Sequence, residues 1–411
     1  MNVNASAHSP RSSGGPLAGI RVVDFTTMLS GPYCTMMLAD LGADVVKVEP
    51  PDGDLLRKTG PGRHPLMGPL FVQANRGKRS VCLDLKDAGA AAALRRIIDG
   101  ADVMIHNMRP SAARRIGIDY ETIAATSPAL VYCAVVGFGT AGPYADLPAY
   151  DDVIQAASGI AAVQSLGVDE PEYVRMALAD KVAGLAAFGA VTAALWYRER
   201  TGRGQYVEVP MLETLSAFVL MEHLYGITFE PPTGSSGYTR VVTPERRPFR
   251  TADGVVSVVF YNDRHWRSFF ELAGRPDLVD DERFDDLTTR TAHSRSLYVL
   301  VADVMKQRTT AEWLKVLRDH DVPAMEVKSP DELITDQHLD AVGFFRRQEH
   351  PSEGTVVLTR PPFVFSKSTV VDADPAPRLG EHTIEILRVV GCTDAEIADL
   401  VDRGVAPPVR N

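Results

Sequence analysis

The sequence predicts an α/β fold, with a large domain on a doubly wound parallel sheet and a smaller α+β domain. Two observations carry this prediction. In the first 210 residues, short runs rich in β-branched residues alternate with helical patterns, which is typical of βαβ units. After about residue 224 a stretch rich in Pro, Gly, Ser and Thr leads into a region of different composition. A chain of 411 residues is long enough for two domains.

The large domain is expected to alternate strands and helices along the chain. Its strands are predicted at residues 20–25, 44–49, 80–85, 102–106, 130–136 and 205–209. Its helices are predicted at residues 31–41, 88–99, 110–125, 151–162 and 181–200. Two further strands and a final helix from about residue 381 are expected near the end of the chain.

The domain boundaries follow from the same segments. Residues 1–16 are rich in Ser, Gly and Pro and lack the apolar run of a signal peptide, so a flexible tail is expected. The other boundaries are predicted as a large α/β domain over 17–224, a linker over 225–248, a small α+β domain over 249–330, and a return linker with the C-terminal part of the large domain over 331–411.

Charge and cysteine content narrow the classes of function. The net charge of −10 argues against nucleic acid or an anionic membrane as a partner. Residues 76–115 nevertheless hold nine Lys and Arg against four Asp, which is a local patch suited to an anionic ligand. Four scattered cysteines without a C-x-x-C pair fit reduced thiols in a cytoplasmic protein and predict no metal site. The most apolar window, residues 182–196, is shorter than the ~18 residues of a membrane span, which predicts a buried helix.

One glycine-rich motif resembles a dinucleotide-binding fingerprint but lacks its context. Residues 137–142 match G-x-G-x-x-G and follow a predicted strand. That fingerprint needs a helix that begins at its last glycine, because the helix N-terminus holds the pyrophosphate. Pro143 follows at once, and a second proline comes soon after, so the chain is expected to continue as a loop.

Asp180 precedes a long apolar helical pattern and allows two interpretations. An aspartate at this place is a favoured N-cap, and its charge suits the helix dipole. The same carboxylate has an ordinary pKa of about 4, so at neutral pH it could attack an activated thioester without a base. The residue alone leaves both interpretations open.

Seven stretches, in one order along the chain, resemble the family III CoA-transferases, the family of formyl-CoA transferase and carnitine CoA-transferase. They are PLAGIRVVDFT (16–26), SGPYCTMMLADLGADVVKVEPPDGD (30–54), NRGKRSVCLDLK (75–86), ADVMIHNMRPSAARRIGI (101–118), YDDVIQAASG (150–159), ADKVAGLAAFGAVTAALWYRERTGRGQYVEVPMLE (179–213) and LGEHTIEILRVVG (379–391). The resemblance implies that Asp180 is the nucleophile of CoA transfer between an acyl-CoA and a small carboxylic acid, through aspartyl-anhydride and aspartyl-CoA thioester intermediates.

The resemblance also implies a CoA site and a quaternary structure. The implied CoA-binding residues are Leu29, Ser30, Leu83, Lys86, Asn107, Met108, Arg109, Arg115, Tyr150 and Asp151. Coenzyme A enters as substrate, and no metal is expected. The implied fold is Rossmann-like, and the implied assembly is an interlocked homodimer of ring-shaped subunits.

Two alternatives remain beside transfer. The α-methylacyl-CoA racemases share the fold, but they have a histidine where Tyr150 stands, and racemisation needs a base on each face of the α-carbon. A CoA-thioester-binding protein without catalysis would need only the basic patch. Formyl-CoA transferase has a glutamine at the position of Leu29, so formyl or oxalyl substrates are not expected here.

Overall fold

The computed structural model describes residues 14–165, 170–407 and 409. Its contacts divide the chain into two units. The large unit holds the chain up to residue 158, residues 174–217 and the chain from residue 340. The small unit holds residues 159–173 and 218–339. Each unit is described by itself below.

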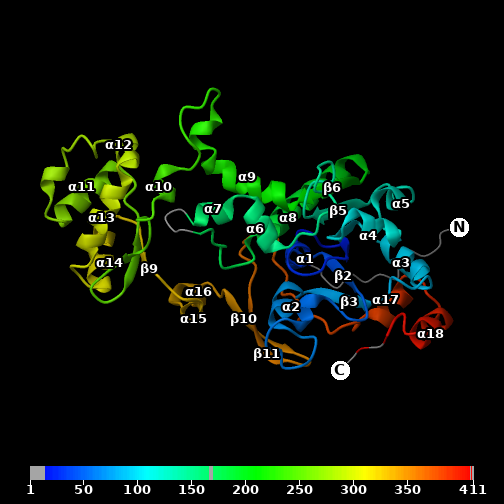
Figure 1. Cartoon of the computed structure of the whole chain (residues 1–411). Coiled ribbons are helices and arrows are strands. Elements are labelled where there is room, and N and C mark those ends of the chain that lie inside the picture. The colour runs from blue at the N-terminus through cyan, green and yellow to red at the C-terminus, as the bar shows by residue number, and fades with distance from the viewer. Residues whose placement is uncertain (1–13, 166–169, 408, 410–411) are drawn as a thin grey trace. The chain divides into compact units, whose positions relative to one another are not determined.

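A six-stranded sheet forms the centre of the large unit (Figure 1). The strands are β1 (Arg21–Asp24), β2 (Asp44–Glu49), β3 (Lys78–Cys82), β4 (Val103–His106), β5 (Val131–Val136) and β6 (Gln205–Pro210). They lie in the order β3-β2-β1-β4-β5-β6, and every neighbouring pair is parallel. The prediction of a parallel α/β sheet is therefore confirmed.

Helices cover both faces of this sheet because parallel strands are apolar on both sides. Successive side chains of a strand point to opposite faces. On one face, Val23 and Phe25 share a core with helices after β3 and β4 and near the end of the chain. Those helices are α3 (Ala90–Asp99), α4 (Pro110–Arg115), α5 (Tyr120–Ala124), α17 (Thr383–Val389) and α18 (Asp394–Asp402). On the other face Asp24 bonds to Thr35 of α1 (Ser30–Asp40).

Helix α1 also packs against α8 (Leu178–Thr201), which lies on β5 and β6. By length and composition alone, α8 is the one helix of the described residues that could cross a membrane, although the core helix of a soluble protein passes the same test. The remaining elements of the large unit are η1 (Leu55–Lys58), α2 (Pro69–Ala74), α6 (Asp151–Ala157) and the antiparallel hairpin of β10 (Phe345–His350) and β11 (Gly354–Thr359).

Glycines divide two segments that were predicted as single helices. The predicted helix 110–125 is α4 and α5, because Gly117 has a φ of 71° in the left-handed region between them. The predicted helix 151–162 is likewise α6 and α7 (Ile160–Gln164), separated by Gly159 with a φ of 88°. The final helix is also two helices, α17 and α18.

The small unit is an α+β structure with an aromatic core. Its three-stranded antiparallel sheet has the order β7-β8-β9, formed by β7 (Phe249–Arg250), β8 (Val255–Val258) and β9 (Ala324–Glu326). Its core includes Trp266, Phe269 and Trp313. Its helices are η2 (Tyr225–Thr228), α10 (Thr239–Val242), α11 (Asp263–Leu272), η3 (Pro276–Leu278), α12 (Leu287–Ala292), α13 (Ser294–Met305), α14 (Thr310–Asp319) and α15 (Pro330–Leu333), beside α7. Two helices, α9 (Met211–His223) and α16 (Gln337–Ala341), cross a boundary between the units.

Candidate active site

The loops after β1 and β4 lie side by side where the strand order of the sheet reverses. From β1 the chain adds β2 and β3 on one side, whereas β4, β5 and β6 follow on the other side. Ligands of open α/β sheets bind beyond the carboxyl ends of the strands at such a switch point. The predicted CoA-binding residues Leu29 and Ser30 follow β1, and Asn107, Met108 and Arg109 follow β4.

Asp180 lies in the first turn of α8 and is not its N-cap. The helix begins at Leu178, and its N-cap is Ala177, whose methyl side chain cannot accept a hydrogen bond. The backbone N–H of Asp180 instead donates to Oδ1 of Asp151 over 2.9 Å. The capping interpretation of Asp180 is therefore wrong, and the cap comes from a residue of α6. The carboxyl group of Asp180 is left free for other contacts.

Gln155 fixes the other side of Asp151 and the segment before α8. Its Nε2 donates to Oδ2 of Asp151 over 2.6 Å and to the carbonyl of Met176 over 3.0 Å. Its Oε1 accepts the N–H of Val174 at 2.9 Å. Since Gln155 is fully buried, these bonds tie α6 firmly to the start of α8. Both oxygens of Asp151 are engaged within the protein, so Asp151 is placed to orient Asp180.

The surroundings of Asp180 make its carboxylate more basic than usual. Burial raises the pKa of Asp180 to about 6, and the negative charge of Asp151 adds to this rise. A hydrogen bond from Ser30 and the positive charge of Lys181 lower the pKa in part. At neutral pH most of the population is still ionised, and a more basic carboxylate is a better nucleophile.

Close packing of α1 on α8 brings Ser30 to Asp180. Ser30 is the first residue of α1 and is buried. Gly184 faces it from the second turn of α8, where a Cβ atom would come within 2.6 Å of the Ser30 carbonyl oxygen. Only glycine allows this approach, which explains why the two helix starts can meet. Two predicted site residues, Ser30 and Asp180, are thus brought together although they lie 150 positions apart in the sequence.

Asn107 joins the two loops of the switch point. Its Oδ1 accepts the N–H of Thr27 at 3.0 Å, and its Nδ2 donates to the Thr27 carbonyl over 2.8 Å. The amide of Asn107 is largely used by this pairing, so its side chain holds the loop after β1. Met108 is half-buried and packs against the core that contains Val23 and Phe25, called the main core below. Its N–H donates to Nδ1 of His106.

Three predicted CoA-binding cations lie exposed at this edge of the sheet. Lys86 follows β3, Arg109 is the N-cap of α4, and Arg115 is the last residue of α4. Within the described residues, none of these three side chains has an ion pair or hydrogen bond, whereas most arginines of the large unit are paired. Unpaired exposed cations at the ends of β3 and β4 suit the phosphate groups of a ligand.

The predicted CoA-binding residues include three large side chains that differ in exposure, namely Leu29, Leu83 and Tyr150. Leu83 is fully buried in the main core, so only its backbone could contact CoA. Leu29 is half-buried and packs with Met28 against a small apolar cluster. Tyr150 is the N-cap of α6 and 62% exposed, so the alternative of a core aromatic residue is wrong.

His106, the buried histidine at the end of β4, does not supply the base that a racemase would need. Nδ1 of His106 accepts the N–H of Met108 at 3.1 Å, and its Nε2 lies 2.9 Å from the Tyr132 hydroxyl. That hydroxyl donates to the carbonyl of Ile118, so Nε2 carries the proton of a neutral ring. Burial lowers the pKa of His106 to about 4, which keeps the ring neutral and occupied by the protein.

The glycine-rich segment 137–142 forms a loop, as predicted. No helix follows it until α6. The N–H of Gly139 donates to Glu213 and the N–H of Thr140 donates to Glu208, over 2.9 and 2.8 Å. These amides are satisfied by carboxylates, so they do not form a phosphate cradle.

Charged residues inside the strands were not predicted as part of the site. Asp24 of β1, Lys47 of β2 and Lys78 of β3 are all buried beneath the loop after β1. Lys47 pairs with Asp54 over 2.9 Å, and Lys78 pairs with Asp24 over 3.1 Å. The signal in the sequence is a charged residue within an apolar strand, which is costly unless it is paired.

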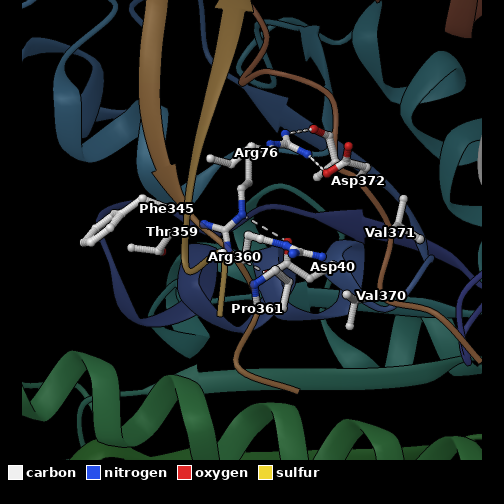
Figure 2. A pocket seen from close by; sticks show the side chains of 12 residues that line it. Asp40, Arg76, Phe345, Thr359, Arg360, Pro361, Val370, Val371 and Asp372 are labelled. Carbon is white, nitrogen blue, oxygen red and sulfur yellow. Dashed lines mark hydrogen bonds and ion pairs between the residues drawn. The ribbon is translucent and has the colours of Figure 1, made fainter. Parts of the chain in front are cut away.

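A large cavity of the large unit lies away from these residues. It has a volume of about 440 Å³ and is lined by side chains such as Arg76, Asp40 and Arg360 (Figure 2). Asp40 is the last residue of α1, whereas Ser30 is the first, so the helix separates them by roughly 15 Å. None of the predicted site residues lines this cavity. In the described part of the chain, no group of three or more His, Cys, Asp or Glu side chains could hold a metal ion.

Known proteins resemble this chain over almost its whole length. The model of CoA-transferase family III matches residues 17–383. The succinate–glutarate CoA-transferase of Agrobacterium fabrum is 33% identical over 383 residues, which cover 90% of this chain and 95% of that protein. The succinyl-CoA:mesaconate CoA-transferase of Haloarcula hispanica is 32% identical, covering 92% and 97%. The crystal structure of a CAIB/BAIF family protein from Brucella suis superposes with a TM-score of 0.78 at 30% identity, covering 92% and 100%.

Proposed function

The chain belongs to CoA-transferase family III, and on this premise we propose that Asp180 carries CoA between an acyl-CoA donor and a carboxylic acid acceptor. The observation that supports the role most directly is the environment of Asp180. Its carboxyl group is largely buried, bonded by Ser30, and ionised at neutral pH despite a raised pKa. It stands beside the switch point of the sheet, where three unpaired cations can meet the phosphates of CoA.

The first half of the proposed reaction transfers CoA to the enzyme. A carboxylate oxygen of Asp180 attacks the thioester carbonyl carbon, the C–S bond breaks, and CoA leaves as a thiolate with the bonding electrons. The product is a mixed anhydride between Asp180 and the donor acid. The thiolate then attacks Cγ of Asp180, and the donor acid leaves as a carboxylate. An aspartyl-CoA thioester remains on the enzyme.

The second half repeats these steps in reverse with the acceptor. The acceptor carboxylate attacks Cγ of Asp180, the thiolate leaves, and a new mixed anhydride forms. The thiolate then attacks the acyl carbon of the acceptor, which releases the new acyl-CoA and restores the Asp180 carboxylate. Protons and electrons balance without a general base. Water must be kept out, because every intermediate can hydrolyse.

The protein's own residues hold the nucleophile during these steps. Asp151 fixes the backbone of Asp180, and Gln155 fixes Asp151. Ser30 donates to the carboxylate and orients it. Lys86, Arg109 and Arg115 are proposed to bind the phosphates of CoA, with Leu83 contributing through its backbone and Tyr150 lining the pocket.

For the substrates, we propose succinyl-CoA as donor and a short dicarboxylic acid as acceptor. The support comes from the relatives, whose names include succinate, glutarate and mesaconate. Half-buried Leu29 and Met28 offer apolar surface beside Ser30 that suits the methylene chain of such an acid.

The function is tested with purified protein, succinyl-CoA and a panel of acids that includes glutarate and mesaconate. Transfer is followed by the appearance of the new acyl-CoA, and mass spectrometry of the Asp180 peptide should show an added CoA during turnover. Hydroxylamine should trap the activated Asp180. An Asp180→Asn variant should show neither adduct nor transfer. Solvent deuterium in a 2-methylacyl-CoA without any acceptor would instead indicate racemisation.

We further propose that the enzyme is an interlocked homodimer that works in the cytoplasm. Several large apolar side chains are exposed in the single chain, including Trp196 of α8 at 64% and Val364 at 96%. Exposed apolar side chains that gather into one patch commonly mark an interface. All four cysteines are free and buried, which fits a reducing compartment. Light scattering should give twice the 44.7 kDa mass of one chain, and a stable monomer would contradict the dimer.

A further inference from the structure

Buried side chains hold three successive residues of the loop after β1 by their backbone. Asp24 accepts the N–H of Thr26 at 2.8 Å, and Lys47 donates to the Thr26 carbonyl over 2.7 Å. Asn107 binds both the N–H and the carbonyl of Thr27. Oδ1 of Asp54 accepts the N–H of Met28 at 3.0 Å. These bonds restrain the backbone of the loop at three successive residues.

Met28 is the residue at which this loop needs the most support. It has a φ of 63°, which lies in the left-handed region that a non-glycine residue rarely adopts. In this conformation the N–H of Met28 donates to Oδ1 of Asp54. Two residues later, Ser30 begins α1. A change at Met28 would therefore alter the direction in which α1 starts.

Lys47 and Asp54 form a pair whose members both contact this loop. Nζ of Lys47 lies 2.9 Å from Oδ2 of Asp54, and both side chains are fully buried. Oδ1 of Asp54 also accepts the N–H of Leu56 at 3.0 Å and so caps η1. The pair thus connects β2, η1 and the loop in the interior of the unit. Burial disfavours the charge of Lys47, but Asp24, Asp54 and Glu49 outweigh burial and raise the pKa of Lys47.

We infer that Lys47 and Asp54 are positioning residues for Asp180, acting through Met28 and Ser30. The pair holds Met28 in the left-handed conformation, and this places the Ser30 hydroxyl on the Asp180 carboxylate. Neither residue touches the carboxylate, so both act at a distance. The inference rests on the proposed role of Asp180 as nucleophile.

The positioning role can be measured through the pKa of Asp180, which depends on the groups that face this residue. They are Ser30 from α1, Asp151 from α6 and Lys181 from α8 itself. Ser30 lowers the pKa of Asp180, whereas Asp151 raises it. If the loop relaxes and Ser30 moves away, the pKa of Asp180 must rise. A purely structural role of Lys47 and Asp54 would lower stability without this rise.

The central experiment compares Asp54→Ala with Ser30→Ala and with the double variant. Asp54→Ala should lower kcat by about 100-fold, the usual effect of a displacement near 1 Å, while KM for the acyl-CoA changes by less than about 3-fold. The rate should fall at low pH as Asp180 becomes protonated, and this fall is the acid limb of the pH–rate profile. In both single variants the acid limb should move to higher pH. Because Asp54 acts through Ser30, the double variant should be no slower than the slower single variant, within about 2-fold.

Further variants control for folding and for general loss of stability. Lys47→Met/Asp54→Ala buries no unpaired charge, and it should behave as Asp54→Ala does. Lys47→Met/Asp54→Asn keeps an acceptor for the Met28 N–H and leaves no buried ammonium beside the new amide, so it should recover much of the activity that Lys47→Met/Asp54→Ala loses. Asp40→Ala breaks the buried pair of Asp40 with Arg76, whose atoms lie 2.6 Å apart at the far end of α1. It should cost stability but leave the acid limb unchanged.

A second measurement separates this inference from the proposed function. Carbodiimide labels protonated carboxyl groups, and mass spectrometry of the Asp180 peptide then gives a titration midpoint without any substrate. If no donor supports transfer but the midpoint rises in Asp54→Ala, the function fails and the positioning role stands. The positioning role is overturned if Asp54→Ala and Lys47→Met/Asp54→Ala keep the wild-type titration midpoint of Asp180. It is also overturned if the fold-losses in kcat of Asp54→Ala and Ser30→Ala multiply in the double variant.

Discussion

The backbone N–H of Asp180 donates to Oδ1 of Asp151 over 2.9 Å, so the residue that fixes Asp180 also changes its acidity. The negative charge of Asp151 adds to burial in raising the pKa of Asp180 to about 6. A carboxylate that attacks a thioester must be ionised but should be as basic as the working pH allows. The contact between the two aspartates meets both needs, since it holds the proposed nucleophile in place and raises its basicity.

Asp151→Asn is expected to shift the pH dependence of transfer to lower pH. The asparagine Oδ1 can still accept the Asp180 N–H, whereas its Nδ2 can no longer accept the bond from Nε2 of Gln155. Because the negative charge is lost, the pKa of Asp180 should fall. The acid limb of kcat against pH should move by the same amount, and kcat at neutral pH should fall because the nucleophile is less basic. Asp152→Asn removes an exposed charge one residue away and should leave the profile in place. An unchanged limb in Asp151→Asn would contradict the role of Asp151.

Asp180→Asn is expected to abolish transfer and to stabilise the fold at neutral pH. The folded pKa of about 6 lies above the unfolded value of 3.8, so the folded state binds more protons between these values. Wild-type stability therefore falls as pH rises through this range and stays lower above it. The gain of the variant at neutral pH is at most about 3 kcal/mol, because one pKa unit corresponds to about 1.4 kcal/mol.

The measurement is the melting temperature of both proteins at several pH values. The variant should melt higher above the folded pKa, and the difference should shrink as pH falls toward the unfolded value. A variant that melts lower than the wild type at every pH would show that ionised Asp180 is not under strain.

The strands were predictable because parallel strands are buried on both faces and so form bounded apolar runs. The predicted strand 44–49 coincides with β2, and the other five strands of the sheet fall within two or three residues of their predicted ends. Helix ends were less predictable where one glycine changes the backbone. Gly117 and Gly159 each turn the chain in the left-handed region, and the apolar pattern alone continues across them.

The sequence proposed members for the candidate site but could not show the contacts among them. The order of the family-like segments made Asp180 and Ser30 candidates, yet nothing local in the sequence shows that Gly184 lets the two residues meet. Asn107 was predicted to bind CoA, but its side-chain amide bonds to the backbone of Thr27 instead. The two residues lie 80 positions apart, so this pairing cannot be seen in the sequence. Lys47 and Asp54 were missed because a buried pair is visible only after the fold brings both charges together.

Leu83→Ala is expected to weaken the fold rather than the affinity for CoA. The side chain is fully buried in the main core, and a leucine-to-alanine change in such a place costs about 2–5 kcal/mol. Urea unfolding should show this loss, while calorimetry of the folded variant should give nearly the wild-type affinity for CoA. A variant of normal stability that binds CoA poorly would mean that the Leu83 side chain contacts the ligand.

Arg109→Ala and Arg115→Ala are expected to weaken CoA binding without affecting the nucleophile. Each should raise the dissociation constant for CoA by about 10-fold or more, because a hydrogen bond to a charged group contributes about 1.5–3 kcal/mol. The loss should shrink at high salt, where the phosphates are screened. Arg114→Ala is the matched control, since Arg114 is also exposed, belongs to the same short helix as Arg115 and lies between the two candidates in the sequence. Calorimetry with CoA at two salt concentrations tests the set. If Arg114→Ala weakened binding as much as its neighbours do, the effect would come from the general charge of α4, and the assignment of Arg109 and Arg115 to the phosphates would be wrong.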